Sequence, residues 1–235
     1  MSKLNILFTL TSLNVLLVTV ERFSFTTKIL LQPYGFLRLH EIFQMTVLIL
    51  VTVIIPFLIL KEVTNNFALF KTKKGFWLAL IFLIGVYFYA TGNGLHEVSS
   101  FNFNHFCDTK NIVGNVCQTM FFNDYYTGNI FYFVGALLMN IPILIFEKVN
   151  PGKKLDRKNL IMLTINALVY AFAIFAYAAF DPVLVGLSYS IIMLGVSIYF
   201  YLVSRKNILK MPLTLYSLIV YLAGTIPALL LKLGR

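Results

Sequence analysis

Residues 76–105 read FWLALIFLIGVYFYATGNGLHEVSSFNFNH, and this stretch decides what kind of fold the chain can form. Residues 76–95 carry no charge and match the length of about 20 apolar residues that a helix needs to cross the hydrocarbon core of a bilayer. Two glycines, a histidine and a glutamate then follow. The pattern predicts a membrane-spanning helix with polar chemistry at one of its ends.

The composition extends this prediction to the whole chain. Hydrophobic residues make up 59% of the 235 residues and the mean hydropathy is +0.84, whereas soluble domains contain about 45–50% apolar residues. We therefore expect one all-α domain, residues 1–235, that forms a polytopic transmembrane helical bundle in an integral, multi-pass membrane protein. The net charge of +10 lies in short loops between apolar runs, so its expected partner is the lipid bilayer and not nucleic acid.

Seven apolar runs are long enough to be spans. They cover residues 4–20, 41–60, 76–96, 125–146, 160–180, 184–203 and 213–231, and the longest loop is 99–124. The first run could also be a signal peptide, but it lacks a small-residue cleavage site, so we interpret it as a transmembrane helix and leave its cleavage open. Residues 26–40, with the turn Pro33-Tyr34-Gly35, are expected to lie on the membrane surface.

The charges of the loops predict the orientation. Lysine and arginine concentrate at the N-terminus and in the loops after the second, fourth and sixth runs, and cytoplasmic loops are enriched in these residues. The other side holds only Arg22, Lys28, Arg38, Lys110, Lys232 and Arg235 of the 19 basic residues. We therefore expect a cytoplasmic N-terminus and an external C-terminus. Cys107 and Cys117 then lie outside, where a disulfide between them is chemically permitted.

Ionisable residues gather at the predicted outer boundary, where a charge at membrane depth is costly unless it faces a polar cavity. They are His40, Glu41, His96, Glu97, Asp124 and Asp181. A carboxylate at a helix N-terminus stabilises the helix by about 0.5–2 kcal/mol. This structural role is expected for Asp124 and Asp181, the latter with Pro182 at the first helical position. For Glu41, capping and function are equally balanced.

Glu97 requires a different explanation, because the third span is expected to end there. A carboxylate at a helix C-terminus meets the negative end of the helix dipole, so Glu97 is either exposed in a loop or compensated by a cation such as Arg38, a protonated histidine or a metal ion. On a continuous helix, His96 shares a face with Tyr89 and Ser100, which favours a functional role for His96 over an ordinary interfacial one. Gly92-Asn93-Gly94 either admits a close helix neighbour or breaks the helix at a cavity.

Three kinds of chemistry fit these residues. His40, His96 and Glu41 could bind zinc or another divalent metal, which would activate a water molecule. Without a metal, His96 could act as a general base oriented by Glu97 or Asp124. The same groups could relay protons or ions in a transporter. The spacing of the residues carries no metal-binding signature that would select the first possibility.

The order Gly92-x-Gly94-Leu95-His96, a loop, and Asp124 at the start of the following helix resembles the seven-helix membrane hydrolases related to alkaline ceramidases. The resemblance implies a zinc-dependent amidase or lipid hydrolase, with His96 as a metal ligand and Asp124 as a supporting acid. The late His-x-x-x-His motif of that family is absent, since no histidine follows His105. Either the metal is lost, His40 and carboxylates replace those ligands, or the likeness is fortuitous.

Two hypotheses about function follow. The first is a membrane-embedded hydrolase that acts on a lipid or amphipathic substrate at the outer membrane boundary, with His96, Glu97 and Asp124 as its catalytic residues. The alternative is a non-catalytic transporter, receptor or subunit of a membrane complex, in which the same residues cap helices and form ion pairs. The sequence names neither a substrate nor a partner subunit.

Overall fold

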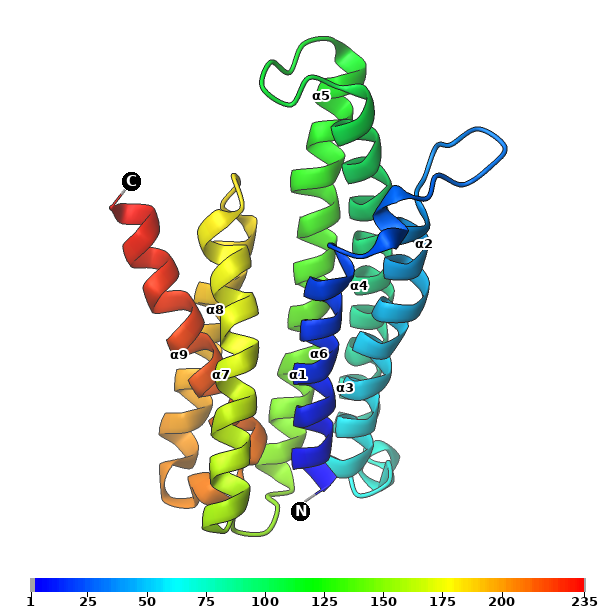
Figure 1. The fold of residues 1–235 in the computed structure, drawn as a ribbon. Coiled ribbons are helices and arrows are strands. Elements are labelled where there is room, and N and C mark those ends of the chain that lie inside the picture. Colours follow the sequence, from blue (N-terminus) through cyan, green and yellow to red (C-terminus); the bar gives the residue numbers. More distant parts are fainter. Residues whose placement is uncertain (1–2, 235) are drawn as a thin grey trace.

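The computed structural model describes residues 3–234, and within this range the chain folds into helices without a strand (Figure 1). The α-helices are α1 (Lys3–Glu21), α2 (Leu39–Phe43), α3 (Ile49–Val63), α4 (Lys73–Phe106), α5 (Asn115–Phe122), α6 (Asn129–Val149), α7 (Arg157–Phe180), α8 (Val185–Ser204) and α9 (Pro212–Leu233). Short 3₁₀ helices are η1 (Phe25–Lys28), η3 (Ala68–Lys71) and η5 (Arg205–Lys210). The segments η2 (Gln44–Leu48) and η4 (Asn123–Gly128) are π-helical.

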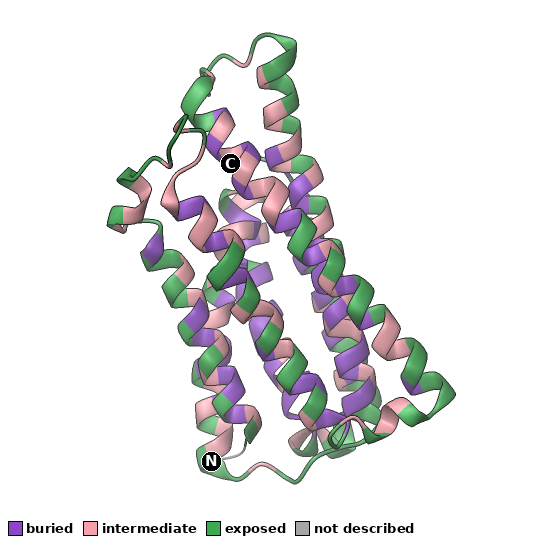
Figure 2. Ribbon diagram, turned by 90° about the vertical axis from the view of Figure 1, so that its right-hand side faces the viewer, coloured by how far each residue is buried: buried purple, intermediate pink, exposed green. Residues whose placement is uncertain are grey.

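Seven helical segments are long and apolar enough to cross a bilayer, which confirms the prediction of an all-α chain with seven helices of membrane-spanning length. The runs are Lys3–Lys28, Leu39–Val63, Lys73–Phe106, Asn115–Val149, Arg157–Phe180, Val185–Lys210 and Pro212–Leu233. Large apolar side chains such as Leu17 and Phe172 face outward, 58% and 69% exposed, as expected of surfaces that contact lipid tails. Buried residues instead face the interior of the bundle (Figure 2).

The helices form two groups, with α1, α3, α4 and α6 in one and α7, α8 and α9 in the other (Figure 1). The start of α1 lies at one end of the bundle, here called the N-terminal end. The opposite end carries α5 and the C-terminus of α9, and is called the α5 end. Helices α4 and α6 pack against each other more extensively than any other pair in the described chain.

Glycines let α4 and α6 approach each other at backbone distance. A Cβ atom added to Gly92 would lie 2.2 Å from the amide nitrogen of Tyr132, and one added to Gly135 would lie 2.2 Å from the amide nitrogen of Tyr89. No side chain fits at either position, so the two helices are held in one register. Of the two roles considered for Gly92-Asn93-Gly94, close packing is the one that Gly92 has.

Helix α4 is longer than the sequence predicts. It continues through Gly94 and Glu97 to Phe106, so the prediction that the third span ends at Glu97 is wrong, and so is the expectation that the helix dipole disfavours this carboxylate. Aromatic packing supports the extension, with the ring centroids of Phe103 and Phe121 5.5 Å apart. Much of the predicted loop 99–124 is therefore helical.

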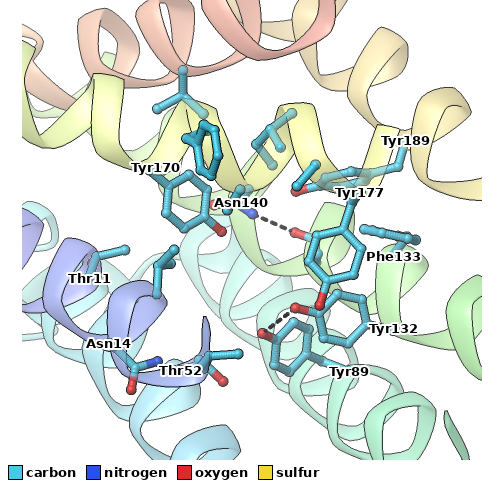
Figure 3. Close-up of a pocket in the computed structure, with 18 of the residues that line it drawn as sticks. Thr11, Asn14, Thr52, Tyr89, Tyr132, Phe133, Asn140, Tyr170, Tyr177 and Tyr189 are labelled. Carbon is cyan, nitrogen blue, oxygen red and sulfur yellow. Dashed lines mark hydrogen bonds between the residues drawn. The ribbon is translucent and has the colours of Figure 1, made fainter. Parts of the chain in front are cut away.

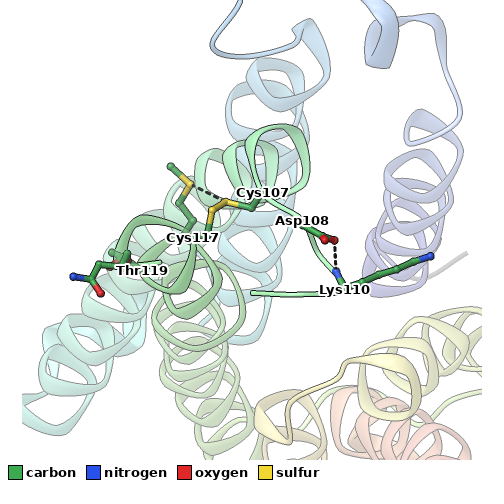
Figure 4. The surroundings of a disulfide bond; sticks show 7 residues. Cys107, Asp108, Lys110, Cys117 and Thr119 are labelled. Carbon is green, nitrogen blue, oxygen red and sulfur yellow. Dashed lines mark hydrogen bonds between the residues drawn. A yellow bond between two sulfur atoms is a disulfide. The ribbon is translucent and has the colours of Figure 1, made fainter. Parts of the chain in front are cut away.

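The turn between α4 and α5 is closed by a disulfide between Cys107 and Cys117 (Figure 4). Inside the turn, the Asp108 carboxylate accepts a hydrogen bond from the backbone N–H of Lys110 at 3.0 Å. The two cysteines considered for a disulfide thus form one at the α5 end of the bundle.

A buried carboxylate holds the start of α9 at the N-terminal end of the bundle. Glu147, 1% exposed, accepts hydrogen bonds from the backbone N–H groups of Leu213 and Thr214, at 2.6 and 2.8 Å, and from the Thr214 hydroxyl at 2.8 Å. These N–H groups belong to the first turn of α9, where a carboxylate is stabilising. The local sequence does not predict this contact, because the partners lie 66 and 67 residues apart.

The α4–α6 contact predicts opposite effects for the same substitution at two positions. Gly92→Ala should lower the free energy of unfolding by about 1–3 kcal/mol, because the methyl group meets the backbone of α6. Gly94→Ala should be neutral or stabilising by up to about 1 kcal/mol, because alanine is the better helix former and the nearest atom to its Cβ is the Met45 sulfur at 4.0 Å. Thermal unfolding of the detergent-solubilised variants measures both effects, and equal melting temperatures would contradict this interpretation.

Candidate functional site

Two adjoining cavities meet at the α5 end of the bundle. The smaller one, here called the polar cavity, has a volume of about 390 Å³ and is lined by Arg22, Thr27, Arg38, His40, Glu41, His96, Glu97 and Ser100. The larger one has a volume of about 640 Å³ and extends from the same level into the bundle. Arg22, His96 and Ser100 line both cavities, so they form the wall that the two share.

A histidine and an aspartate pair at this shared wall. The Nδ1 atom of His96 lies 2.7 Å from Oδ1 of Asp124 and 3.2 Å from the backbone carbonyl oxygen of Asp124. The Asp124 side chain is 2% exposed, and the His96 side chain is 23% exposed. With a proton on Nδ1, the ring donates to the Asp124 backbone carbonyl beside the carboxylate, and Nε2 is the ring nitrogen left to accept a proton from another group. The pair therefore has the arrangement of a general base and its orienting acid.

The local structure around Asp124 explains how the pair forms. Asp124 lies in the π-helical segment η4, and such segments interrupt the regular helical hydrogen-bond pattern and recur at functional sites. A Cβ atom added to Gly128 would lie 2.9 Å from the backbone nitrogen of His96, so this glycine lets α4 come close. The prediction that Asp124 caps the fourth span is wrong, because the helical run already begins at Asn115.

His40 pairs with a residue that the sequence did not single out. Its Nδ1 atom lies 2.5 Å from Oε2 of Glu21, which is at the end of α1. The same oxygen accepts a hydrogen bond from the Gln44 side chain at 2.9 Å, and the other oxygen accepts one from the Thr26 hydroxyl. Glu21, 8% exposed, thus ties α1 to η1, α2 and η2 beside the polar cavity.

Glu41 has the capping role that was one of its two expected roles. It is the third residue of α2, and its carboxylate accepts the backbone N–H of Arg38 at 2.8 Å and the Arg38 guanidinium at 2.9 and 2.5 Å. The guanidinium also lies over the Phe101 ring, 5.1 Å from its centroid. The pair fixes α2 against α4.

Glu97 is buried, at 7% exposed, although it faces a cavity. It interacts electrostatically with His96, Arg22 and His40. Arg22, which directly follows α1, also interacts with the Tyr177 hydroxyl on α7. Of the compensating cations considered for Glu97, the structure places an arginine and two histidines near it, and the arginine is Arg22.

The larger cavity is here called the tyrosine cavity, because tyrosines from five helices, α4, α6, α7, α8 and α9, line it. Figure 3 shows several of them. The hydroxyls of Tyr89 and Tyr132 are 3.0 Å apart and their rings stack at 4.4 Å. The hydroxyls of Tyr189 and Tyr221 are 2.6 Å apart. Tyr170 contributes from α7. The cavity therefore combines an apolar wall with hydroxyl groups in the middle of the bundle.

Asp181 lies in the turn between α7 and α8 and lines the tyrosine cavity. Its carboxylate accepts hydrogen bonds from the Val183 N–H at 3.2 Å and the Asn129 side chain at 3.3 Å, and its carbonyl accepts one from Lys232 at 2.6 Å. Helix α8 begins only at Val185. The prediction that Asp181 opens the sixth span, with a proline at the first helical position, is therefore wrong.

The three predicted metal ligands do not converge. His40 is engaged by Glu21, His96 by Asp124, and Glu41 by Arg38. Among residues 3–234 no group of three or more histidine, cysteine, aspartate or glutamate side chains has the geometry to hold a metal ion. The donor set present does not fit the zinc site proposed from the sequence.

Several residues of the site were missed by sequence reasoning. Glu21 and Arg22 follow an apolar run and look like ordinary boundary charges. The tyrosines carried a signal that could have been used, since Tyr132, Tyr170 and Tyr221 lie well inside predicted spans, whereas tyrosine is usually enriched at the membrane interfaces.

No family model, no curated protein and no solved structure matches this chain.

The environment of Asp181 predicts a pH effect. Burial raises the pKa of its carboxyl above the ordinary value of 3.8, against the opposing effects of the Val183 N–H and nearby cations. A folded-state pKa above the unfolded one means that the folded protein binds the proton more tightly, so stability is lost as pH rises from about 3.8 through the raised pKa.

Asp181→Asn removes this pH-dependent loss of folding stability, because asparagine does not titrate, and it keeps an oxygen that can accept a hydrogen bond. The melting temperature of the wild type, measured relative to that of the variant, should therefore fall as pH rises through this window. A difference that does not change with pH would show that Asp181 does not titrate with a raised pKa.

Proposed function

We propose that the protein is an integral membrane hydrolase that acts on a lipid or other amphiphile, with His96 as general base and Asp124 as its orienting acid. The observation that carries this proposal is the position of the His96–Asp124 pair on the wall shared by the polar and tyrosine cavities. An amphiphile needs a polar compartment beside an apolar one, and the reacting bond would lie where they meet.

The geometry supports a hydrolysis step in which each proton is accounted for. Asp124 holds the His96 ring with its Nδ1 proton bound, and Nε2 takes a proton from a water molecule that attacks the carbonyl carbon of an ester or amide. The imidazolium formed then gives its proton to the leaving oxygen or nitrogen. Arg22, on the same wall, supplies positive charge near the developing oxyanion, and Glu97 beside it keeps the arginine in place.

The loop charges and the cysteines support an external location for this site. Basic residues concentrate at the N-terminal end of the bundle, which favours a cytoplasmic location for that end. The Cys107–Cys117 disulfide lies at the α5 end, and disulfides persist in oxidising compartments. Both observations support our proposal that the N-terminus lies inside and the C-terminus outside, with the reaction at the outer leaflet.

The second candidate function is a non-catalytic transporter, receptor or complex subunit. The pairs His40–Glu21 and Arg38–Glu41 favour it, because the first connects α1 to α2 and the second, with its guanidinium over Phe101, holds α2 against α4, as structural contacts would. In such a protein the His96–Asp124 pair would carry a proton or hold helices together, and no bond of the ligand would be broken.

Substitution of the pair separates these functions. We expect His96→Ala and Asp124→Asn to lower hydrolysis of ester- or amide-linked lipids in mixed micelles by about 10²-fold or more, because general-base catalysis contributes about 10²–10⁴-fold. His105→Ala is the matched control, since His105 is exposed on the same helix and lines neither cavity.

The lipid profile of membranes that contain each variant provides a second readout. If the wild type, His96→Ala and Asp124→Asn leave the same profile and none hydrolyses any lipid of the panel, the enzyme proposal fails and the second candidate remains. Metal analysis of the active preparation tests whether hydrolysis uses a bound ion.

A further inference from the structure

The tyrosine cavity reaches the lipid-facing surface between α1 and α7. Several side chains that line it are also exposed on the outside of the bundle. On α1 these include Leu16, 49% exposed, and Thr19, and on α7 they include Phe172, 69% exposed, and Phe180, 58% exposed. All four lie in the halves of α1 and α7 nearer the α5 end, so the opening is confined to that half of the membrane.

Nearer the N-terminal end, hydrogen bonds between polar side chains join α1 to α7. The side chain of Asn5 donates to Oδ1 of Asn159 at 2.8 Å. Further along, the side chain of Asn166 donates to the Thr9 hydroxyl at 3.0 Å, and the Ser12 hydroxyl donates to the carbonyl of Asn166 at 3.1 Å. Hydrogen bonds between helices hold membrane bundles together. These hydrogen bonds therefore join α1 and α7 from Asn5 to Ser12, and beyond Ser12 residues of both helices line the tyrosine cavity.

The side chain of Asn14 lies at the wall of the cavity just beyond these hydrogen bonds. Its oxygen is itself buried, so it reaches a ligand in the cavity when the amide rotates and its oxygen and nitrogen exchange places. Asn14 is 4% exposed and lines the tyrosine cavity, and its side-chain oxygen has no hydrogen-bond partner within the described residues. Figure 3 shows Asn14 with Thr11 and Thr52 across from the tyrosines. A buried polar atom without a partner is unfavourable, so a ligand that offers an O–H or N–H at this depth would be favoured.

We propose that the gap between α1 and α7 is a lateral portal through which the acyl chain of an amphiphile enters the tyrosine cavity from the bilayer. The chain lies among the tyrosines, a hydroxyl or amide N–H of the ligand donates to Asn14, and the polar head remains at the wall formed by Arg22 and His96. The choice of an amphiphile as the occupant rests on the proposed function, but entry of a chain through the portal does not require that the protein hydrolyse it.

The single tryptophan of the chain makes chain entry measurable. In Trp77→Phe with Phe133→Trp, the fluorophore replaces a side chain that is 5% exposed and lines the cavity. The probe is a dibrominated stearate added to vesicles of unbrominated phosphatidylcholine. We expect saturable quenching of this tryptophan at low mole fractions of the probe, whereas Trp77 in the wild type, 54% exposed, should be quenched only in proportion to the probe in the bilayer.

Blocking the portal should abolish the saturable quenching. Ala176→Phe adds a ring to the α7 side of the opening, and Ala173→Phe is a second block if the first variant does not fold. Ala90→Phe is the matched control, because Ala90 is exposed on α4 and lines neither cavity. Quenching that survives both blocks in folded protein, or that is absent from the unblocked protein, overturns the portal.

Two further comparisons separate the portal from the catalytic proposal and test the role of Asn14. Quenching reports entry of a chain and the lipid assay reports hydrolysis, so the two proposals fail in different ways. A protein that shows saturable quenching but hydrolyses no lipid of the panel contradicts the catalytic proposal alone, and one that hydrolyses lipid without saturable quenching contradicts the portal alone. Unlabelled monohydroxystearates, with the hydroxyl moved along the chain, should displace the probe best at one position, and Asn14→Leu should remove that preference. Equal displacement by every isomer and by stearate would overturn the role of Asn14. A cross-linked dimer joined through α1 and α7, with no quenching, would show that a second copy fills the gap.

Discussion

The close backbone approach of α4 and α6 is the constraint on which the rest of the structure depends. Gly92 and Gly135 remove the side chains that would separate the two helices, and Gly128 does the same beside His96. Without these contacts, His96 on α4 could not reach Asp124 in η4. The same helix pair places Tyr89 against Tyr132 at the wall of the tyrosine cavity, so one packing surface positions both the reactive pair and the pocket beside it.

The second constraint is the cost of charge at membrane depth. The histidines of the site meet carboxylates from other helical segments, in the contacts His40–Glu21 and His96–Asp124, and Arg38 pairs with Glu41 at the start of α2. These pairs gather at the α5 end, while the middle of the bundle carries only hydroxyls and amides. Because burial of unpaired charge is far more costly than burial of a hydroxyl, this gradient from ionic to weakly polar groups suits a ligand with a polar head and an apolar chain.

Features that depend on neighbouring residues could be predicted from the sequence, whereas features that depend on contacts between distant residues could not. Apolar run length is a local property, so the prediction of seven helices long and apolar enough to cross a membrane is confirmed. The end of α4 was misplaced, because Gly94 and Glu97 resemble a helix end while the packing of Phe103 carries the helix on. Asp124 was selected for the site but assigned the wrong helical position. The pairing of Glu21 with His40 could not be predicted, because it depends on how α1 and α2 meet in space.

The central claim is that the polar and tyrosine cavities together hold one amphiphile, with its head at His96 and its chain among the tyrosines. The most direct measurement is a cryo-electron microscopy structure of the protein in lipid nanodiscs, enlarged by a bound antibody fragment. We predict continuous elongated density that begins beside His96 and runs past Tyr132 toward Tyr189. A tyrosine cavity closed by its own side chains, or density confined to the outside of the bundle, would contradict this interpretation.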